Sequence, residues 1–437
     1  MRAVSANLLA WLLFCTCACV FYVWNRLEGS RLDRFTRGPQ SLRRESRHAG
    51  GPPLDLSVQT FRALLTVPSA QRLRLGDGGL YVRNLTDVKE QTGTSGSRDD
   101  RINVDAEESA QRGGSDLVSL VEEGIFWSGR LEEQLPVSFS EGHARAWRER
   151  ARGQRVVKLE PGCGRVSNQL ATFWDGTKVC VRYGINAEQV QGETLTYYLA
   201  GLLGITNVPP LVLSQLNPDS EQWGDVRRHA ARLQWSDWAV VSLTEWVANL
   251  TAVVTPEPLR QNSEGLRPLP GELGNYTTGE LLELMQWTDL ILLDYLSANF
   301  DRLVSNMFSL QWDARVMERE TNNLLRTPRG DLVFVDNEAG LVHGFRVLDM
   351  WEKYHGAVLG SVCVFRRRTA QRVLELHRRR DTRTRLLELY GDSEPLSPEL
   401  GFLSDEHARV LQTRIDRVHR HISHCKGKYQ QLGSVTV

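Results

Sequence analysis

The sequence predicts an α+β fold in which a strand-rich lobe precedes a helical lobe. Short β-branched runs separated by turn residues fill the first half of residues 117–430, and long helical patterns fill the second half. At 437 residues the chain has room for one large or two ordinary domains and further segments. We expect an N-lobe at about residues 117–250, a C-lobe at about 251–430, and ligand binding between them.

The first element is an uncharged apolar segment. Residues 6–24, ANLLAWLLFCTCACVFYVW, are long enough at ~1.5 Å per residue to cross a ~30 Å hydrocarbon core. We interpret residues 6–25 as a transmembrane signal anchor behind a short cytosolic tail, residues 1–5. A cleaved signal peptide and a buried core helix are the alternatives, and the length of the run and its terminal aromatic residues favour the anchor.

Residues 26–116 are expected to form a largely disordered lumenal stem. The segment EQTGTSGSRDDRINVDAEESAQRGGSD has no aromatic residue and almost no apolar one, so it cannot bury enough surface to offset the entropy of ordering. Only VQTFRALLTV, which begins at Val58, has the pattern of a local helix.

The charge pattern and the sequons disagree about the side of the membrane. Acidic and basic residues balance at 53 each, which argues against a general nucleic-acid-binding protein. Seven arginines from Arg26 to Arg47 would place the body in the cytosol by the positive-inside rule. Sequons at Asn84, Asn249 and Asn275 favour glycosylation in a lumen. Together with the cysteines, they lead us to expect a lumenal body.

The body contains an even number of cysteines and no C-x-x-C pair. They are Cys163, Cys180, Cys363 and Cys425, and they permit three disulfide connectivities. We favour pairing Cys163 with Cys180 and Cys363 with Cys425, because each pair lies within one local unit. Four buried free thiols are the alternative.

The N-lobe elements follow from local patterns. The runs RVVKLE, QLATFW and KVCVRYG predict strands, with turn signals PGCG and DGT between them. AEQVQGETLTYYLAGLLG predicts an amphipathic helix that ends at Gly204. VPPLVLS and WAVVSLTEWV follow as strands, the second apolar enough for the interior of a sheet.

The C-lobe opens with a helix that must be buried. NYTTGELLELMQWTDLILLDYLSANF has Thr277 and Glu280 at capping-box spacing and then becomes apolar on every side. A hairpin of FSLQW and DLVFVD is expected after it. RTAQRVLELHRRRDTRTRLLELY and DEHARVLQTRIDRVHRHISHC predict amphipathic helices with basic outer faces.

The stretch ANFDRLVSN contains the first candidate catalytic residue. Asp301 and Asn306 have the D-x-x-x-x-N spacing of a kinase catalytic loop, where the Asp accepts a hydroxyl proton and the Asn binds a metal on the nucleotide. The His-Arg pair that usually precedes the Asp is replaced by Asn299-Phe300. A helix-end ion pair of Asp301 with Arg302 is the ordinary alternative.

A second acid lies in GDLVFVDNEAGLVHG, where a β-type run delivers Asp336 onto a turn. A carboxylate presented in this way suits a metal ligand, and an Asx-turn without a ligand is the alternative. The order of helix, D-x-x-x-x-N loop, hairpin and strand-end Asp favours the catalytic interpretation of both acids.

A phosphate-transferring site also needs a cation and an acid that orients it. Arg182 on KVCVRYG and Glu193 on QVQGETL fit these roles. Lys158 and Lys178 compete with Arg182 as the phosphate-contacting cation, and the sequence does not rank them.

Other motifs are absent or weak. The chain has no G-x-x-x-x-G-K-[ST], and GCG is more typical of a hairpin turn than of a phosphate cradle. No D-x-D is present, which disfavours the Golgi glycosyltransferase suggested by the anchor and stem. A zinc site near Cys425 is disfavoured against a basic helix end. Its candidate ligands are His419, His421 and His424.

Over residues 118–430 the chain resembles the four-jointed family of Golgi secretory-pathway kinases. The resemblance rests on VRYGIN with QGETLTYYLAGLLG, VPPL, WTDLILLDYLSANFDRLVSN, FVDNEAGLVHG, and Cys363 and Cys425. It implies an atypical two-lobed protein-kinase-like fold in a single-pass type II Golgi membrane protein with a lumenal body, which the family can release by cleavage in the stem.

The resemblance also implies an activity: transfer of phosphate from ATP, with Mn or Mg, to Ser or Thr in cadherin repeats of the Fat and Dachsous type, which tunes planar cell polarity and growth. By this resemblance, Asp301 is the catalytic Asp and Asp336 is the metal-binding Asp. Glu193 is the acidic residue of the helix, and Arg182 occupies the position of the strand lysine. A non-catalytic cadherin-binding regulator is the second hypothesis.

Overall fold

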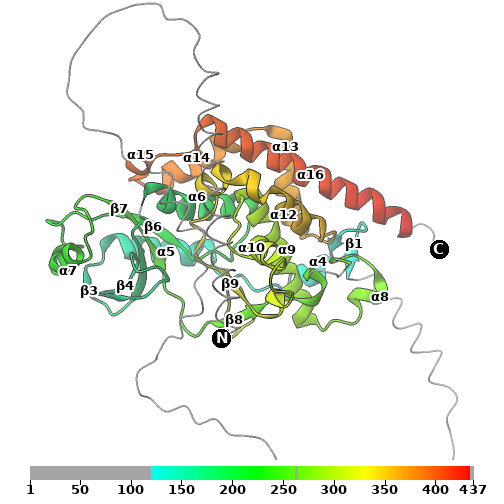
Figure 1. Cartoon of the computed structure of the whole chain (residues 1–437), viewed down its shortest axis with the longest axis horizontal. Helices are drawn as coiled ribbons and strands as arrows, with labels where there is room; N and C mark the ends of the chain where they lie inside the picture. The colour runs from blue at the N-terminus through cyan, green and yellow to red at the C-terminus, as the bar shows by residue number, and fades with distance from the viewer. Residues whose placement is uncertain (1–119, 185, 261–263, 434–437) are drawn as a thin grey trace, which may run out of the picture. The chain divides into compact units, whose positions relative to one another are not determined.

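The computed structural model describes residues 120–184, 186–260 and 264–433, all within one compact unit of the chain (Figure 1). The predicted anchor, the stem and Asn84 lie outside the described residues. Within the described ranges, no helix has the length and apolar character needed to cross a membrane.

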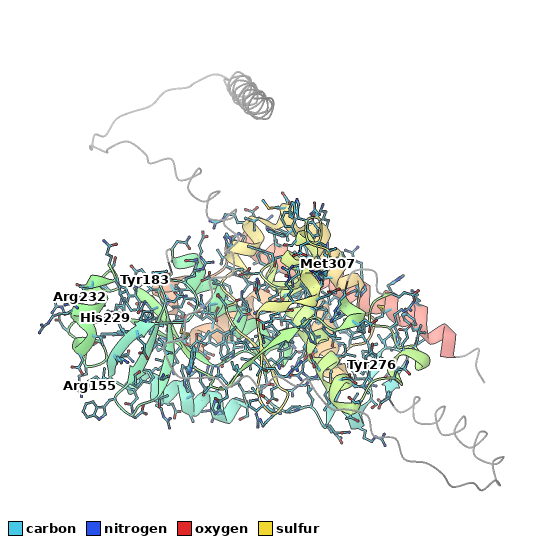
Figure 2. All side chains as sticks on the ribbon, turned by 60° about the horizontal axis from the view of Figure 1, so that its bottom comes forward. Arg155, Tyr183, His229, Arg232, Tyr276 and Met307 are labelled. Atoms are coloured by element: carbon cyan, nitrogen blue, oxygen red, sulfur yellow. A yellow bond between two sulfur atoms is a disulfide. The ribbon has the colours of Figure 1, made fainter. Side chains whose placement is uncertain are left out.

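An antiparallel five-stranded sheet organises the first half of this unit. Its strands, in spatial order, are β3 (Val156–Pro161), β4 (Gln169–Phe173), β5 (Lys178–Arg182), β7 (Val240–Glu245) and β6 (Leu211–Gln215). Alternate apolar residues of the strands form a core with α5 (Glu141–Gly153), η1 (Gly224–Val226) and Trp235. Helix α7 (Arg227–Arg232) lies at this end of the unit (Figure 1), and Figure 2 labels two of its residues, His229 and Arg232. The predicted inner strand is confirmed, since β7 pairs on both sides.

Helix α6 (Ala187–Leu203) joins the sheet to the helices. Asn186 caps its N-terminus by accepting a hydrogen bond from the amide of Gln189, and Gly204 ends it at φ 73°. A positive φ favours glycine, so the predicted end of this helix is confirmed. Its apolar residues pack in the same core as those of α9 (Thr278–Ser297).

Helix α9 forms where the capping box and the apolar run predict it. Thr277 and Glu280 make both reciprocal cap bonds, and the helix is buried from Leu284 to Ser297. Ala298 ends it at φ 54°, and α10 (Leu303–Ser309) begins after a four-residue loop that contains Asp301.

The predicted hairpin partner of DLVFVD was wrong. Residues 308–312 belong to α10 and a turn, and β10 (Leu332–Phe334) pairs instead with β9 (Glu320–Arg326). A third strand, β8 (Thr251–Val254), completes this small antiparallel sheet. The sequence of β9, ETNNLLR, has mainly polar residues and therefore lacks the alternation that predicts a strand.

Helices cover the rest of the C-terminal half. The basic segment predicted as one helix divides into α13 (Arg367–Arg379) and α14 (Thr382–Ser393) at Arg380, whose φ is 53°. The remaining elements are β1 (Val121–Glu122), β2 (Phe126–Trp127), α4 (Gly129–Glu132), η2 (Glu257–Leu259), α8 (Pro270–Leu273), η3 (Val316–Glu318), α11 (Val342–Arg346), α12 (Leu348–Gly360), α15 (Ser397–Leu400) and α16 (Asp405–Gly433).

The first described segment packs on the helical half. The amide of Trp127 donates to the carbonyl of Phe365 over 3.0 Å, and Trp127 is fully buried in the helical core. The α+β class with a sheet before the helices is confirmed.

Both favoured disulfides are present. Cys163 joins Cys180 across 17 residues of chain, and Cys363 joins Cys425 across 62. The first ties the β3–β4 loop to β5, and the second ties the segment after α12 to α16.

Candidate active site

Arg182, at the end of β5, contacts three carboxylates. Its Nη1 lies 2.6 Å from Glu338 Oε2 and 3.0 Å from Asp336 Oδ1, and its Nε lies 3.7 Å from Glu193 Oε2. Burial opposes the charge on Arg182, but the three acids outweigh it and raise the pKa above the ordinary value for arginine. The structure thus brings Arg182 and Glu193 together, as the sequence led us to expect, and it adds Glu338 to the cluster.

Glu193 also positions the turn that contains Asp336. Its Oε2 accepts a hydrogen bond of 2.5 Å from the backbone amide of Asn337. Asp336 itself has φ 55°, a strained conformation for a non-glycine residue, so the contacts of its neighbours must hold it. Burial raises the pKa of Glu193, and the charge of Arg182 opposes that rise.

Arg302 connects the loop that contains Asp301 to the end of α9 and to the turn of Asp336. This fully buried side chain donates to Asp294 Oδ1 at 2.6 Å and to Asn337 Oδ1 at 2.6 Å. It also donates to the carbonyls of Asn323 and Val335. The alternative of an ion pair between Asp301 and Arg302 is therefore wrong, because Arg302 pairs with Asp294 instead.

Asp301 is held by two asparagines. Its amide donates to Asn299 Oδ1 over 3.1 Å, and its Oδ2 accepts from Asn323 Nδ2 over 2.9 Å. Burial, and next the charge of Asp336, raise the pKa of Asp301 to about 6, while Arg302 opposes the rise. A carboxylate with this pKa is still ionised near neutral pH and is basic enough to accept a proton.

Asn306 lies one turn into α10, and its backbone amide donates to the carbonyl of Arg302. The residue is 6% exposed, and its Nδ2 has no hydrogen-bond partner among the described residues. Asp336 Oδ1 is also buried without a hydrogen bond of acceptable geometry in this part of the chain, despite its closeness to Arg182. Buried polar atoms in this state are typical of sites that await a ligand.

The competing lysines lie away from this cluster. Lys158 and Lys178 both pair with Glu160, at 2.6 and 3.9 Å, and at least half of each side chain is exposed. A different cation, Arg165 on the β3–β4 loop, forms an ion pair with Glu338 Oε1. The loop that contains GCG is thus a turn, as predicted, and it also reaches the acidic cluster.

Four residues of this cluster were not predicted as site residues: Glu338, Asn337, Arg302 and Arg165. The run of three polar residues, Asp336 to Glu338, directly after an apolar strand was a usable signal for Glu338. Arg165 had no such signal, because its partner lies 173 positions along the chain.

The side chains present suit a divalent metal and a nucleotide. Carboxylates outnumber the arginines that neutralise them, since Asp301, Asp336, Glu193 and Glu338 face Arg182 and Arg165. Oxygen ligands with excess negative charge are those that Mg²⁺ and Mn²⁺ prefer. Asp336 Oδ1, which lies near Arg182 but has no hydrogen bond among the described residues, is a candidate ligand atom for such an ion.

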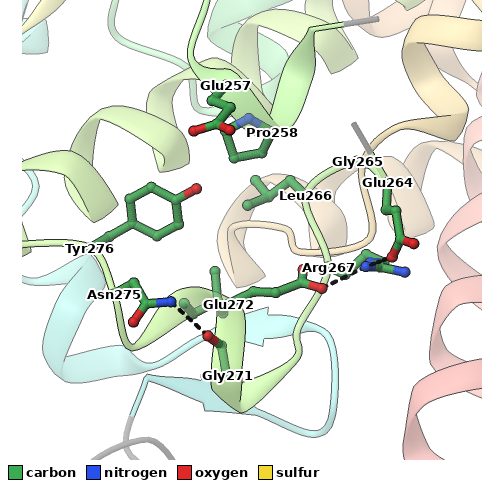
Figure 3. A pocket seen from close by; sticks show the side chains of 11 residues that line it. Glu257, Pro258, Glu264, Gly265, Leu266, Arg267, Gly271, Glu272, Asn275 and Tyr276 are labelled. Atoms are coloured by element: carbon green, nitrogen blue, oxygen red, sulfur yellow. Dashed lines mark hydrogen bonds and ion pairs between the residues drawn. The ribbon is translucent and has the colours of Figure 1, made fainter. Parts of the chain in front are cut away.

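A separate cavity of about 470 Å³ lies before α9 (Figure 3). Glu257, Leu266, Arg267, Glu272 and Tyr276 help to line it, and Arg267 pairs with Glu272 at its edge. None of the candidate active-site residues lines this cavity.

The remaining predicted sites lie on the surface. Asn249 and Asn275, the two described glycosylation candidates, are exposed, and Asn275 Nδ2 donates to the carbonyl of Gly271 over 2.8 Å.

The zinc alternative near Cys425 is disfavoured because Cys425 forms a disulfide with Cys363 and so has no thiolate to offer a metal. His421 Nε2 lies 2.7 Å from the carbonyl of Val362.

Comparisons with known proteins settle the family. The Four-jointed box protein middle domain matches residues 142–428. The chain belongs to the four-jointed box protein family. Four-jointed box protein 1 of Xiphophorus maculatus is 67% identical over 433 residues, which is 99% of this chain and 100% of the relative. The Homo sapiens protein of that name is 49% identical over 98% of both chains.

A more distant four-jointed relative carries an activity in its name. The Extracellular serine/threonine protein kinase four-jointed of Drosophila melanogaster is 34% identical over 70% of this chain and 61% of its own length. Among solved structures, the Golgi casein kinase gives a TM-score of 0.48 at 13% identity over 74% of this chain and 91% of its own. The same kinase with Mn/ADP bound gives 0.45 at 14% identity over 65% and 77%.

Proposed function

We propose that this four-jointed protein is a serine/threonine protein kinase with an atypical two-lobed kinase fold, which transfers the terminal phosphate of ATP to a protein hydroxyl. The observation that carries the proposal is a cluster of acids: Glu193 and Asp336 pair with Arg182, and the charge of Asp336 in turn reaches Asp301. The name of the Drosophila relative supports the same reaction class.

Asp301 is the proposed catalytic base. Its carboxylate accepts the proton of a Ser or Thr hydroxyl as that oxygen bonds to the terminal phosphorus and the bond to the oxygen of the departing ADP breaks. The hydrogen bond from Asn323 orients the carboxylate. Burial keeps water from competing for it and raises its pKa toward the working range.

Asp336 and Asn306 would hold the divalent metal ion, Mn or Mg, that the reaction with ATP requires. When bound, the ion neutralises charge on the phosphates and on the leaving oxygen. Arg182 and Glu193 contribute by fixing the turn of Asp336. Arg182 then has a structural role, in which its positive charge neutralises the three carboxylates that it contacts.

The acceptor and the location are proposed from the family. We take the acceptor to be Ser or Thr in extracellular cadherin repeats of the Fat and Dachsous type, with effects on planar cell polarity and growth. The two disulfides and the exposed Asn249 and Asn275 suit a lumenal body in the Golgi. Residues 6–25 would anchor it as a type II membrane protein, with release by cleavage in the stem.

The test is phosphate transfer by the full-length chain purified in detergent, with labelled ATP, Mn²⁺ and cadherin repeats. We expect transfer by the wild type and a loss of about a hundredfold or more for Asp301→Asn, since general-base catalysis contributes that much. Asp336→Asn should lose transfer as well.

Asp313→Asn is the matched control, because Asp313 follows α10 and its carboxylate contacts Arg319 and the amide of Arg315, neither of which belongs to the candidate site. It should transfer phosphate at the wild-type rate. No transfer by the wild type, or equal rates for Asp301→Asn and Asp313→Asn, would sink the proposal. Wild-type effects on cadherins that survive both aspartate variants would favour the non-catalytic regulator.

A further inference from the structure

Glu338 is shared between two arginines of very different exposure. Its Oε2 lies 2.6 Å from Arg182, whose side chain is 9% exposed, and its Oε1 pairs with Arg165, whose side chain is 50% exposed. Arg182 is tied to two further acids, so it cannot leave without exposing several buried charges. Arg165 has Glu338 as its one ion-pair partner in the described part of the chain.

The β3–β4 loop holds Arg165 beside the acids. Cys163, two residues before Arg165, is joined to Cys180 on β5. Because side chains two apart on a strand share a face, Cys180 lies on the same face of β5 as Arg182. A Cβ on Gly164 would lie 3.7 Å from Asp336 Oδ2, so the backbone of the loop runs in contact range of that carboxylate.

The far side of the loop is also fixed. Trp235 Nε1 donates to the carbonyl of Ser167 over 3.2 Å, and Asn168 Nδ2 donates to the carbonyl of Cys163 over 3.2 Å. These bonds hold the backbone of the loop, whereas the Arg165 side chain is half exposed and is held by its ion pair with Glu338. Arg165 can therefore change partner by rotating its side chain, without moving the loop.

The chemistry of the cluster gives that partner. The Arg165 side chain is half exposed, and Glu338, which is buried, is still neutralised by Arg182 when Arg165 leaves, so exchanging Glu338 for a phosphate costs Arg165 little. A guanidinium binds phosphate through a planar, two-pronged contact that a lysine cannot reproduce. The positive charge of Arg165 also opposes the rise in the pKa of Asp301 that burial and Asp336 cause, so Arg165 lies within electrostatic range of Asp301.

We propose that Arg165 leaves Glu338 when a nucleoside polyphosphate binds and that its guanidinium contacts the terminal phosphates. The inference rests on the proposed kinase function, since the nucleotide is that enzyme's substrate. Released from Arg165, Glu338 keeps the contact of its Oε2 with Arg182 and the hydrogen bond that its Oε1 accepts from Gln189 Nε2.

The test is calorimetric binding of three nucleotides to the full-length chain in Mn²⁺: a non-hydrolysable ATP analogue, ADP and AMP. For Arg165→Met we expect the affinity for the ATP analogue to fall tenfold or more, a smaller fall for ADP and no change for AMP. Arg165→Lys should recover part of the loss. The unliganded melting temperature should stay close to the wild-type value, because Arg165 is half exposed and the buried Glu338 keeps its contact with Arg182.

Arg155→Met is the matched control. Arg155 precedes β3 at the end opposite the loop, is 43% exposed and pairs with Asp225 (Figure 2). It should bind all three nucleotides as the wild type does. Unchanged affinity of Arg165→Met for the ATP analogue, or an equal loss for all three nucleotides, would overturn the proposal.

Wild-type binding separates this inference from the proposed function. No nucleotide binding by the wild type overturns both. Normal binding with no phosphate transfer overturns only the kinase function, and the comparison of Arg165 variants still decides the role of Arg165.

Discussion

Asp301 should impose a pH dependence on phosphate transfer. Its pKa is raised to about 6, first by burial and then by Asp336. The deprotonated carboxylate accepts the proton, so the rate should rise as pH rises through the pKa. Asn323 Nδ2 stabilises the charged form by a 2.9 Å bond to Oδ2, and Asn323→Gly should therefore move the limb of the pH–rate profile to higher pH.

Glycine suits this test because Asn323 has φ 57° and glycine adopts that conformation without strain. Arg380→Gly, at another left-handed position with φ 53°, is the control and should leave the profile unchanged. The measurement is kcat against pH for the three proteins. A limb that stays in place, or moves to lower pH, in Asn323→Gly contradicts the assigned role of Asp301.

At the scale of elements, the contact between α6 and the Asp336 turn depends on Gly192. A Cβ there would lie 2.5 Å from the carbonyl oxygen of Glu338 and 2.8 Å from that of Gly340. Both are backbone atoms, so Gly192→Ala must push the helix away from the turn. Glu193 then separates from Asn337, and we expect transfer to fall by about a hundredfold, as misplacement by ~1 Å can cause.

Gly201→Ala, on the same helix, is the matched control. Its Cβ would meet only Leu389 Cδ2 at 3.8 Å, an ordinary contact. Alanine should stabilise the helix there by about 0.5–1 kcal/mol and leave transfer unchanged. Denaturant unfolding and transfer rates for both variants make the comparison, and equal rates would show that the contact of α6 with the turn is not needed.

The elements that the sequence predicted well are those with local causes. Helices α6 and α9 have a glycine end or a capping box together with a long apolar pattern, and both formed as predicted. Strand β9 was missed because its pairing, and not its composition, makes it a strand. The division at Arg380 was missed because an arginine there gives no sign of a left-handed φ.

The candidate site was predictable to the same degree. Asp301, Asp336, Arg182 and Glu193 follow from motif order and spacing, and the structure brings them together. Arg165 and Arg302 contact acids or backbone of the site through folding alone, so only the structure identifies them. Arg302 pairs with Asp294, eight residues earlier, and not with the adjacent Asp301.

At the scale of the whole molecule, the two disulfides lie in different halves of the described chain. Cys363–Cys425 closes 62 residues in the helical half, and Cys163–Cys180 closes 17 in the sheet. Constraint of the unfolded chain gives about 4 kcal/mol for the longer loop and about 3 kcal/mol for the shorter one. Only the shorter one adjoins Arg165 and Asp336.

Paired serine substitutions should therefore separate stability from ligand binding. Serines at Cys363 and Cys425 should lower the free energy of unfolding by about 4 kcal/mol and leave the affinity of the folded protein for Mn²⁺ and ATP analogue intact. Serines at Cys163 and Cys180 should lower stability slightly less and weaken that affinity, because the loop that presents Arg165 is released.

Denaturant unfolding and calorimetry measure the two quantities, and each pair of serines is the control for the other. A chelator should leave the melting temperature of the wild type unchanged, because Cys363 and Cys425 are bonded to each other and do not bind zinc with His421. Equal loss of nucleotide affinity in both serine pairs would mean that the disulfides act on the site only through overall stability. If a chelator lowered the melting temperature, the alternative of a zinc site at Cys425 and His421 would have to be restored.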